Sequence, residues 1–518
     1  MQKYFKTSRV VIALLFFIAV IISFSDIKGV LPSGFYKSVL YLQFIPSLLK
    51  FITPGTIISA GFIIVLIITI IGGRIYCSAI CPLGIFQDII IFFKRKIKSK
   101  YRPRFKKALN ILRYSFLGVA IISLLFSGLI VVNLLDPYAN FGRIASNLLQ
   151  PITVFSNNIV ARFLPFLGLH PLVQNQFHLA SFIVATLVLL VVMSMSWIQG
   201  RLYCNSICPV GTFLGLVSKL SFNKIKISDS ACTRCGKCLT ACKANCIDIK
   251  TMYVDESRCI NCFNCIQACE DSAIGYMSTK HLKRAVTDSG ANLRLRFFML
   301  SAAGYITTKL TPVIASSSSS EQDDENIHTC YWERGVVTPP GSKSTEHLKS
   351  RCISCHLCIS VCPTKVLQPS FLEYGFTGML MPKMDYMVHF CNYDCTKCGE
   401  VCPTGAIMHL PVNEKKITQI GKVQFVKEYC IVETDGTACG SCSEHCPTQA
   451  VKMVPYKNDL TIPETDTSIC IGCGACEYAC PVEYPHKAIF VVSSNPHLLA
   501  EKPVSESIEY EEKEDFPF

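Results

Sequence analysis

The sequence lacks the motifs with which common enzymes bind nucleotides or activate a nucleophile. No G-x-G-x-x-G follows a predicted strand, no P-loop is present, and no serine or cysteine stands in a nucleophile context. Acidic residues are also scarce in the first 320 residues, which hold 10 Asp or Glu against 34 Lys or Arg. The missing motifs exclude the familiar dinucleotide-dependent, nucleotide-hydrolysing and acyl-transfer enzymes, and no dedicated substrate pocket is indicated.

Charge and hydropathy divide the chain of 518 residues into two parts. Residues 321–518 reverse the charge balance, with 16 basic and 27 acidic side chains. The basic side chains of the first part lie between apolar stretches and at their ends, where they set membrane topology, so we expect no nucleic-acid partner. The mean hydropathy of +0.37 is high for a soluble protein. A basic, apolar part is therefore joined to an acidic, cysteine-rich part.

Four apolar stretches predict transmembrane helices, and the last three are each near the ~20 residues that cross a bilayer. They are residues 10–23, 55–73, 111–135 and 180–198. Residues 94–107 contain nine Lys or Arg, which places this loop on the cytoplasmic side. Charge and proline interrupt two further apolar segments, 35–52 and 148–169, which predict interfacial helices. The expected fold class is an α-helical membrane bundle of four transmembrane helices, with a fifth if residues 290–320 also cross, joined to α+β ferredoxin-like iron–sulfur lobes.

A motif occurs twice in the expected membrane module, residues 1–222. G73-R-I-Y-C77-S-A-I-C81-P returns as G200-R-L-Y-C204-N-S-I-C208-P, each time directly after a predicted span. The repeat predicts a pseudo-symmetric bundle in which Cys77, Cys81, Cys204 and Cys208 converge near the axis. Four thiolates suffice for one cubane, but they could equally act as dithiols or simply pack. The repeated C-P context favours metal or redox use over packing, and a cluster at this place would be the seventh.

Two ferredoxin-type cysteine runs, A and B, predict a two-cluster lobe at residues 223–285. In the C-x-x-C-x-x-C-x-x-x-C pattern, three thiolates hold one 4Fe–4S cluster and the fourth reaches to its neighbour. One cluster is therefore expected on Cys232, Cys235 and Cys238 with Cys269, and the other on Cys259, Cys262 and Cys265 with Cys242. The usual proline after each fourth cysteine is absent, and Cys246 is surplus. Cys246 could take the place of Cys242.

Four further runs, numbered 1 to 4, occupy residues 321–500, and each ends in C-x-x-C-x-x-x-C-P. Run 1 contains Cys352, Cys355, Cys358 and Cys362; run 2 contains Cys391, Cys395, Cys398 and Cys402; run 3 contains Cys430, Cys439, Cys442 and Cys446; run 4 contains Cys470, Cys473, Cys476 and Cys480. Disulfides and zinc are the plain alternatives, but neither needs a third thiolate two residues on and a fourth before proline. The six runs predict six 4Fe–4S clusters and one-electron transfer.

Some residues outside these assignments allow weaker interpretations. Cys352-Ile-Ser-Cys355-His356 matches a haem attachment pattern, but its cysteines belong to a complete cubane run, so covalent haem is not expected. Cys330 has no partner run and receives no role. His170 and His178 stand near the outer end of the fourth span and could hydrogen-bond a quinone headgroup, although interfacial histidines are more often simply solvated. The sequence alone therefore assigns no quinone-binding residue.

Residues 290–320 determine on which side of the membrane the second part lies. Arg294-Leu-Arg296 and the apolar run after it resemble a degenerate twin-arginine export signal, followed by serines. A surface helix with a serine-rich linker would instead leave everything in the cytoplasm. We favour export. The chain would then lie in the inner membrane of a bacterium, with residues 321–500 in the periplasm and the two-cluster lobe in the cytoplasm. Acidic residues 501–518 predict a disordered tail.

The two C-x-x-x-C-P repeats and the lobe after them resemble the NapH-type membrane ferredoxins of the NosR/NapH group. From Thr338-Pro-Pro-Gly-Ser to Ile489, the four runs with their stretched third member are similar to the NapG/MauM ferredoxin type. The resemblance implies a fusion of a quinol-side membrane module with an electron-carrying module. It also implies that run 1 exchanges its fourth ligand with run 4, and run 2 with run 3.

These features favour a membrane-anchored polyferredoxin that transfers electrons between the (mena)quinol pool and a partner oxidoreductase or cytochrome. The alternative is an electron-donating maturation or regulatory factor for another metalloenzyme. An oxidoreductase with its own small-molecule substrate would need a cofactor for which the sequence has no motif. No catalytic residue is therefore assigned.

Overall fold

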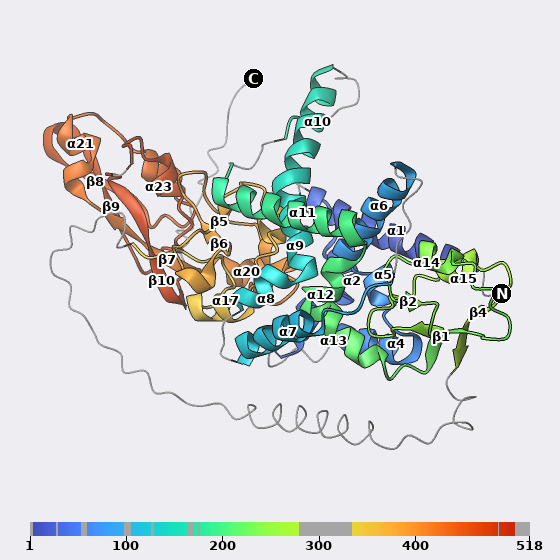
Figure 1. Cartoon of the computed structure of the whole chain (residues 1–518). Coiled ribbons are helices and arrows are strands. Elements are labelled where there is room, and N and C mark those ends of the chain that lie inside the picture. Colours follow the sequence, from blue (N-terminus) through green and yellow to red (C-terminus); the bar gives the residue numbers. More distant parts are fainter. Residues whose placement is uncertain are drawn as a thin grey trace, which may run out of the picture.

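The computed structural model describes residues 4–26, 29–52, 60–97, 105–125, 129–163, 170–172, 177–278, 334–484 and 486–502. These form a helical module up to residue 222, a two-run lobe (223–278) and a four-run domain (334–502), coloured blue to green, light green, and yellow to red in Figure 1. The signal-like segment 290–320, Cys330 and nearly all of the acidic tail lie outside the described residues.

The helical module consists of two series of helices in the same order. The first series is α1 (Tyr4–Ser25), α2 (Ser33–Tyr41), α3 (Phe44–Phe51), α4 (Gly61–Gly72), α5 (Tyr76–Ala79) and α6 (Pro82–Ile97). The second is α7 (Asn110–Leu125), α8 (Ile130–Leu135), α9 (Pro137–Ile144), the π-helical η1 (Ala145–Leu149), α10 (Gln150–Phe163), α11 (Leu179–Gln199), α12 (Leu202–Ser206) and α13 (Pro209–Ser218). The series interlock, because α6 packs on α11 and α13 packs on α4.

Two helices, α1 and α11, are long and apolar enough to cross a membrane. They correspond to the expected spans at 10–23 and 180–198. As described, α4 and α7 are apolar but shorter, with 12 and 16 residues. Residues 53–59 and 126–128, which belong to these two expected spans, lie outside the described part. The bundle of four transmembrane helices therefore stays a prediction.

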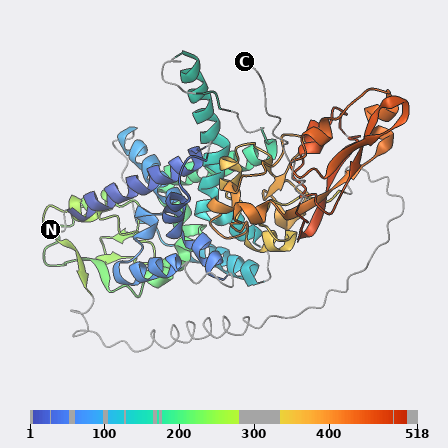
Figure 2. The ribbon, with the colours of Figure 1, turned by 180° about the vertical axis from the view of Figure 1, so that it is seen from behind.

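The two iron–sulfur parts lie at opposite ends of α1 (Figures 1 and 2). At its N-terminal end, the ring of Phe5 packs 5.5 Å from that of Phe263 in the two-run lobe. At its C-terminal end, Phe24 lies against Gly142, at the point where α9 touches the backbone carbonyl of Cys355 in the four-run domain. The 22 residues of α1 rise about 33 Å, close to the thickness of the hydrocarbon core.

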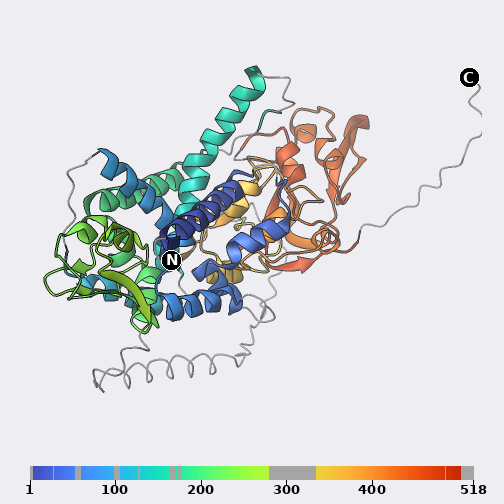
Figure 3. The ribbon, with the colours of Figure 1, turned by 90° about the vertical axis from the view of Figure 1, so that its right-hand side faces the viewer.

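Helix α11 makes the same two connections in the opposite direction. Its first residues border a cavity together with His356 of the four-run domain. At its last residue, the backbone carbonyl of Gln199 accepts a hydrogen bond from the side chain of Asn245 in the two-run lobe. Each of the two long apolar helices therefore separates the lobe from the domain, and Figure 3 shows this separation from the side.

The two-run lobe has short strands around paired helices, which agrees with the expected α+β ferredoxin-like class. Its elements are β1 (Asn223–Ile227), α14 (Lys237–Ala241), β2 (Ile247–Asp248), β3 (Tyr253–Val254), α15 (Asn264–Ala268) and β4 (Ile274–Ser278). β1 pairs antiparallel with β4, with Ile225 opposite Tyr276, and β2 pairs antiparallel with β3. The β2–β3 hairpin lies between run A and run B, which it brings side by side.

The four-run domain repeats this plan twice. Its first half has α17 (Thr345–Arg351), α18 (Leu357–Val361), β5 (Leu367–Pro369), η5 (Phe376–Gly378), β6 (Pro382–Met384), α19 (Lys397–Val401) and α20 (Val412–Lys415). Its second half has η6 (Lys427–Tyr429), α21 (Ile431–Thr434), α22 (Ser441–Glu444), β8 (Val451–Pro455), η7 (Lys457–Asp459), β9 (Thr461–Thr465) and α23 (Ala475–Ala479). A ribbon of β7 (Thr418–Phe425) and β10 (Ile489–Leu499) joins the halves.

Candidate iron–sulfur centres

Four of the six runs (A, B, 1 and 4) share an unusual loop conformation. In each, the residues before and after the second cysteine have a positive φ; they are Arg234, Gly236, Asn261, Phe263, Ser354, His356, Gly472 and Gly474. The two left-handed residues turn the chain tightly enough for three cysteines to face one space. They also aim backbone N–H groups at sulfur, since Ser354 donates to Sγ of Cys352 over 3.4 Å and Gly472 donates to Sγ of Cys470 over 3.4 Å.

The fourth cysteine of these motifs ends a short helix in an extended conformation. Its ψ is 116° at Cys362, 115° at Cys402 and 126° at Cys480. A following proline favours this region by steric exclusion of the helical one. Cys242 and Cys269 reach ψ values of 121° and 107° without a proline. The missing prolines of the two-run lobe therefore do not change the direction of the fourth side chain.

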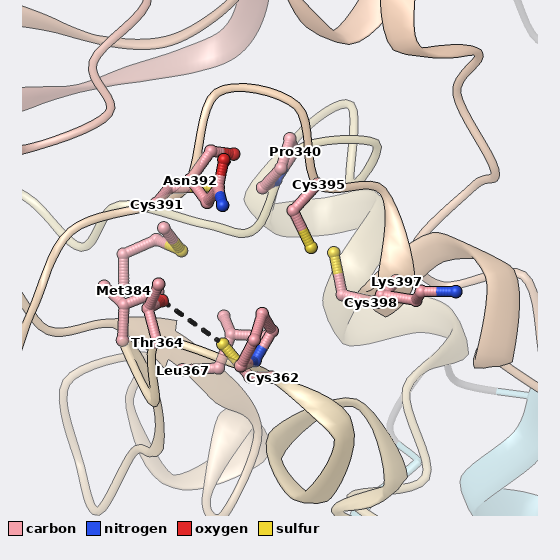
Figure 4. Close-up of a pocket in the computed structure, with 12 residues that line it drawn as sticks. Pro340, Cys362, Thr364, Leu367, Met384, Cys391, Asn392, Cys395, Lys397 and Cys398 are labelled. Carbon is pink, nitrogen blue, oxygen red and sulfur yellow. Dashed lines mark hydrogen bonds between the residues drawn. The ribbon is translucent and has the colours of Figure 1, made fainter. Parts of the chain in front are cut away.

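Run 2 forms a cavity with the last cysteine of run 1. Cys391, Cys395 and Cys398 line a space of about 350 Å³ together with Cys362. Figure 4 shows the sulfur atoms of Cys362, Cys395 and Cys398 turned toward this space. In the reciprocal arrangement, Cys402 of run 2 lies beside the first three cysteines of run 1. Runs 1 and 2 therefore exchange their fourth cysteines.

Runs 3 and 4 exchange in the same way, so the expected pairing of run 1 with run 4 and of run 2 with run 3 is wrong. One cavity of about 330 Å³ is lined by Cys430, Cys439, Cys442 and Cys480. Another, of about 280 Å³, is lined by Cys446, Cys470, Cys473 and Cys476. The physical reason is local: the β5–β6 and β8–β9 hairpins lie between consecutive runs and close only short loops.

The two-run lobe follows the expected exchange, with one ambiguity that remains. Cys242 of run A lies beside Cys262 and Cys265 of run B. In return, Asp271, two residues after Cys269, accepts a hydrogen bond from Thr233 in run A over 2.8 Å. The surplus Cys246 is buried, with its sulfur 3.7 Å from that of Cys242. Both thiols therefore lie beside the cysteines of run B, and Cys246 stays an alternative to Cys242 as the fourth ligand there.

The cysteine groups have the character of cluster sites rather than of single-ion sites. Among the described residues, no three His, Cys, Asp or Glu side chains come close enough to share one metal ion. The described cysteines are also all free thiols. Burial raises the pKa of Cys352 to about 12 and that of Cys442 to about 12, so these ligands give up protons when they bind iron. Each of these cavities is lined by the four cysteines that one cubane needs.

The four cysteines of the repeated C-x-x-x-C-P motif converge as the repeat predicts. Cys77, Cys81, Cys204 and Cys208 are at most 4% exposed and interact electrostatically with one another. Hydrogen bonds reach the sulfurs of the second motif: the Gln87 amide donates to Cys204 and the Gly211 N–H to Cys208, each over 3.3 Å. We call these four residues the central thiol group.

Two buried arginines cross over between the repeats at this group. Arg74 of the first motif donates to the carbonyl of Cys204 over 3.3 Å, and Arg201 of the second donates to the carbonyl of Cys77 over 2.8 Å. Each guanidinium also reaches the sulfur of its own motif, at 3.7 and 3.9 Å. Glycines leave room for them, since a Cβ at Gly84 would stand 2.7 Å from Arg201 and one at Gly211 would stand 3.0 Å from Arg74.

This crossed pair gives the central thiol group a positive surrounding without solvent. Both arginines are fully buried. Burial outweighs their charge for the free thiols and raises the pKa of Cys81, Cys204 and Cys208, but the two guanidinium groups would stabilise an anionic cluster bound to these sulfurs. The group therefore suits a cluster or a redox-active set of thiols better than simple packing. Sequence reasoning assigned neither arginine a role, although the arginine stands three residues before the first cysteine in both copies of the motif.

A chain of polar and aromatic side chains leads from the central thiol group to run 1. Tyr203, beside Cys204, accepts a hydrogen bond from Asn140 on α9 over 3.0 Å. Tyr138, two residues earlier on α9, lies beside Cys355, Cys358 and Cys402. Proline at its first turn and Asp136 as its cap begin α9 inside the module. Sequence reasoning missed the contact of Tyr138 with run 1, because it joins residues more than 200 positions apart.

The histidines have different environments. His356 is buried, donates from Nε2 to the carbonyl of Leu380 over 3.0 Å, and accepts at Nδ1 from Asn147 over 3.3 Å. Burial lowers its pKa to about 3, so this ring is a neutral structural link rather than the histidine of a haem motif. His178 shares a cavity with it. The side chain of His170 is exposed, and His170 is held through its backbone carbonyl by Asn157.

Comparison with known protein families identifies iron–sulfur modules in three regions. A 4Fe-4S binding domain matches residues 54–100 and 181–228, which contain the two C-x-x-x-C-P motifs. A second 4Fe-4S binding domain matches residues 346–368 in run 1. A 4Fe-4S dicluster domain matches residues 390–450 and 435–484, across runs 2 to 4. No solved structure matches the chain.

Several curated proteins are similar to parts of the chain. The methylamine utilization ferredoxin-type protein MauN of Methylobacillus flagellatus is 25% identical over 36% of this chain and 53% of its own length. The ferredoxin-type protein NapF of Escherichia coli K12 is 25% identical over 31% of this chain and 93% of its length. MauM of Methylophilus methylotrophus, a methylamine utilization ferredoxin-type protein, is 31% identical over 28% of this chain and 66% of its length. The chain therefore spans only about half of its MauN relative.

Fold, site and comparisons together define a class. The chain is a ferredoxin-type iron–sulfur protein with several 4Fe–4S binding domains, and its chemistry is electron transfer.

Proposed function

We propose that this chain is a membrane-anchored polyferredoxin that transfers electrons between the (mena)quinol pool and a partner oxidoreductase or cytochrome. It combines a membrane module of the NapH type with a four-cluster part of the NapG/MauM type. Six 4Fe–4S clusters, held by runs A, B and 1 to 4, supply one-electron transfer, with a seventh at the central thiol group. The chain is anchored in the inner membrane of a bacterium.

The observation that carries this proposal is the placement of cysteine groups along the two long apolar helices. The two-run lobe is attached at one end of α1, the four-run domain at the other, and the central thiol group lies between them. Tyr203, Asn140 and Tyr138 fill the interval between the central group and run 1. Such a series of sites supports transfer across the bilayer rather than along one surface.

The same placement supports the export of the four-run domain. If α1 and α11 cross the membrane, the lobe lies on the cytoplasmic side with the basic loop 94–107, and the four-run domain lies in the periplasm. We expect alkaline phosphatase fused after residue 502 to be active, because this enzyme matures only in the periplasm. The same enzyme fused after residue 278 should be inactive. Equal activity of both fusions, or the reverse order, would contradict this topology.

Quinol exchange is tested directly with purified, cluster-loaded protein in liposomes. We expect menaquinol added to the oxidised protein to bleach the visible absorbance of the clusters, and a quinone analogue to block the bleaching. The control is the same protein with Cys355→Ala and Cys402→Ala, which lacks two ligands next to the module. Failure of any quinol to reduce the wild-type clusters would refute the conduit. It would then favour the alternative of a maturation factor, whose deletion leaves a partner enzyme without metal.

A further inference from the structure

A cavity lies at the seam between the helical module and the four-run domain. Its walls come from η1, from the start of α10, from Phe177, His178 and Phe182 at the start of α11, and from the loop of run 1 with His356. The space inside the cavity and at its open mouth amounts to about 470 Å³. The cavity therefore adjoins both a long apolar helix and the loop of a predicted cluster.

One polar group in this cavity has no partner among the described residues. Nδ1 of His178 is buried and makes no hydrogen bond within that part of the chain. Burial lowers the pKa of His178, so the ring is neutral at pH 7, with one nitrogen as acceptor and the other as donor. His356, by contrast, has both nitrogens occupied, by Leu380 and Asn147. His178 is therefore the side chain available to a ligand, while His356 holds the seam together.

The surroundings of the cavity are apolar and lead along the helices. The rings of Phe177 and Phe182 lie 5.1 Å apart at one wall. Beyond them, α11 exposes Leu179, Ile183 and Leu187, and α10 exposes Ile152 and Phe155. Figure 1 shows α10 projecting from the module near the start of α11. A ligand with a ring-sized polar head and a long apolar tail matches this combination of an enclosed histidine and an open apolar surface.

We propose that this cavity binds the headgroup of a membrane quinone, with His178 hydrogen-bonded to one of its two oxygens. The inference rests on the proposed function and adds to it the place of exchange. Oxidation of a quinol releases two electrons and two protons. His178 would take one hydroxyl proton and water the other. Cys352, Cys355 and Cys358 with Cys402 would hold the cluster that supplies the one-electron acceptor, and His356 lies in the loop of these cysteines. The tail lies along the apolar surfaces of α10 and α11.

The test is the affinity of the full-length, cluster-loaded protein for the quinol analogue 2-heptyl-4-hydroxyquinoline N-oxide, measured by quenching of the analogue's fluorescence. We expect His178→Leu to weaken binding about tenfold, because a buried hydrogen bond to the headgroup is lost. The matched control, His170→Leu, removes an exposed histidine outside the cavity and should bind like the wild type. Phe182→Trp, which fills the cavity from α11, should also weaken binding, with the iron content of all variants unchanged.

The outcomes separate this inference from the proposed function. If the wild type exchanges electrons with quinol but His178→Leu and Phe182→Trp bind the analogue as tightly as the wild type, the cavity is not the site, and the conduit survives. If the wild type neither binds the analogue nor is reduced by quinol, both proposals fail. If His178→Leu alone loses iron, the affinity of Phe182→Trp for the analogue decides the question. An unchanged affinity in Phe182→Trp would overturn the assignment of this cavity as the quinone site.

Discussion

Replacing Cys362 and Cys391 together by alanine is expected to remove one cluster and leave the other centres intact. Both side chains line the same cavity between runs 1 and 2, so the double variant takes two of four ligands from a single site. A cubane with two thiolates is not retained, and the purified protein should lose about four irons and one electron paramagnetic resonance signal. Iron analysis of anaerobically purified protein and redox titration of its spectra measure this loss.

The matched comparison is Cys362→Ala with Cys470→Ala. Cys470 lines the cavity completed by Cys446, so this second double variant takes one ligand from each of two sites and should perturb two centres. An exchange between runs 1 and 4 gives the opposite result, because Cys362 and Cys470 would then share a cluster. The pairing of run 1 with run 4, which the family resemblance implies, would be restored by the reverse result. In that case the Cys362 and Cys391 variant would have two perturbed centres and the Cys362 and Cys470 variant only one.

The difference between these pairings shows which parts of such a protein can be predicted from sequence. Spacing within a run acts over a few residues, so the positive φ values around Cys355 and Cys473 and the extended cysteine before proline are local consequences of the motif. Pairing between runs depends on the hairpins that separate them. The short β5–β6 and β8–β9 ribbons contain few residues with a clear strand pattern, and the pairing implied by resemblance overlooked them.

The helical module shows the same limit in another form. The repeated motif was sufficient to predict that Cys77, Cys81, Cys204 and Cys208 converge, because two copies of one pattern imply a symmetric arrangement. The motif did not predict that each arginine donates a hydrogen bond to the opposite copy of the motif. That exchange depends on the interlocking of α6 with α11 and of α13 with α4, which are contacts between distant residues. The apolar runs likewise located α1 and α11, although the run at 10–23 is shorter than the 22 residues of α1.

A second large effect is expected at Asp88, where three positive side chains from separate parts of the chain meet one carboxylate. Its oxygens lie 2.7 Å from Arg201, 2.8 Å from Lys243 and 3.3 Å from Arg9. These cations come from the second repeat, the two-run lobe and α1. Burial alone would raise the pKa of Asp88, but Arg201 and Lys243 outweigh it and lower the pKa to about 2. The contribution of this carboxylate is therefore complete above about pH 4 and is lost only as the pH falls toward 2.

Asp88→Asn is expected to destabilise the module by about 3–5 kcal/mol, because it leaves the two buried arginines and the partly buried Lys243 without their counter-charge. The measurement is chemical unfolding in detergent at pH 7, followed by the helical circular dichroism signal, with protease release of the two-run lobe as a second readout. Glu433→Gln, which removes the exposed ion pair with Lys457 in the four-run domain, is the control and should change little. Adding Arg9→Met to Asp88→Asn removes one stranded charge and should recover part of the loss. A loss below about 1 kcal/mol in Asp88→Asn, or no recovery in the double variant, would mean that this carboxylate does not hold the three parts together.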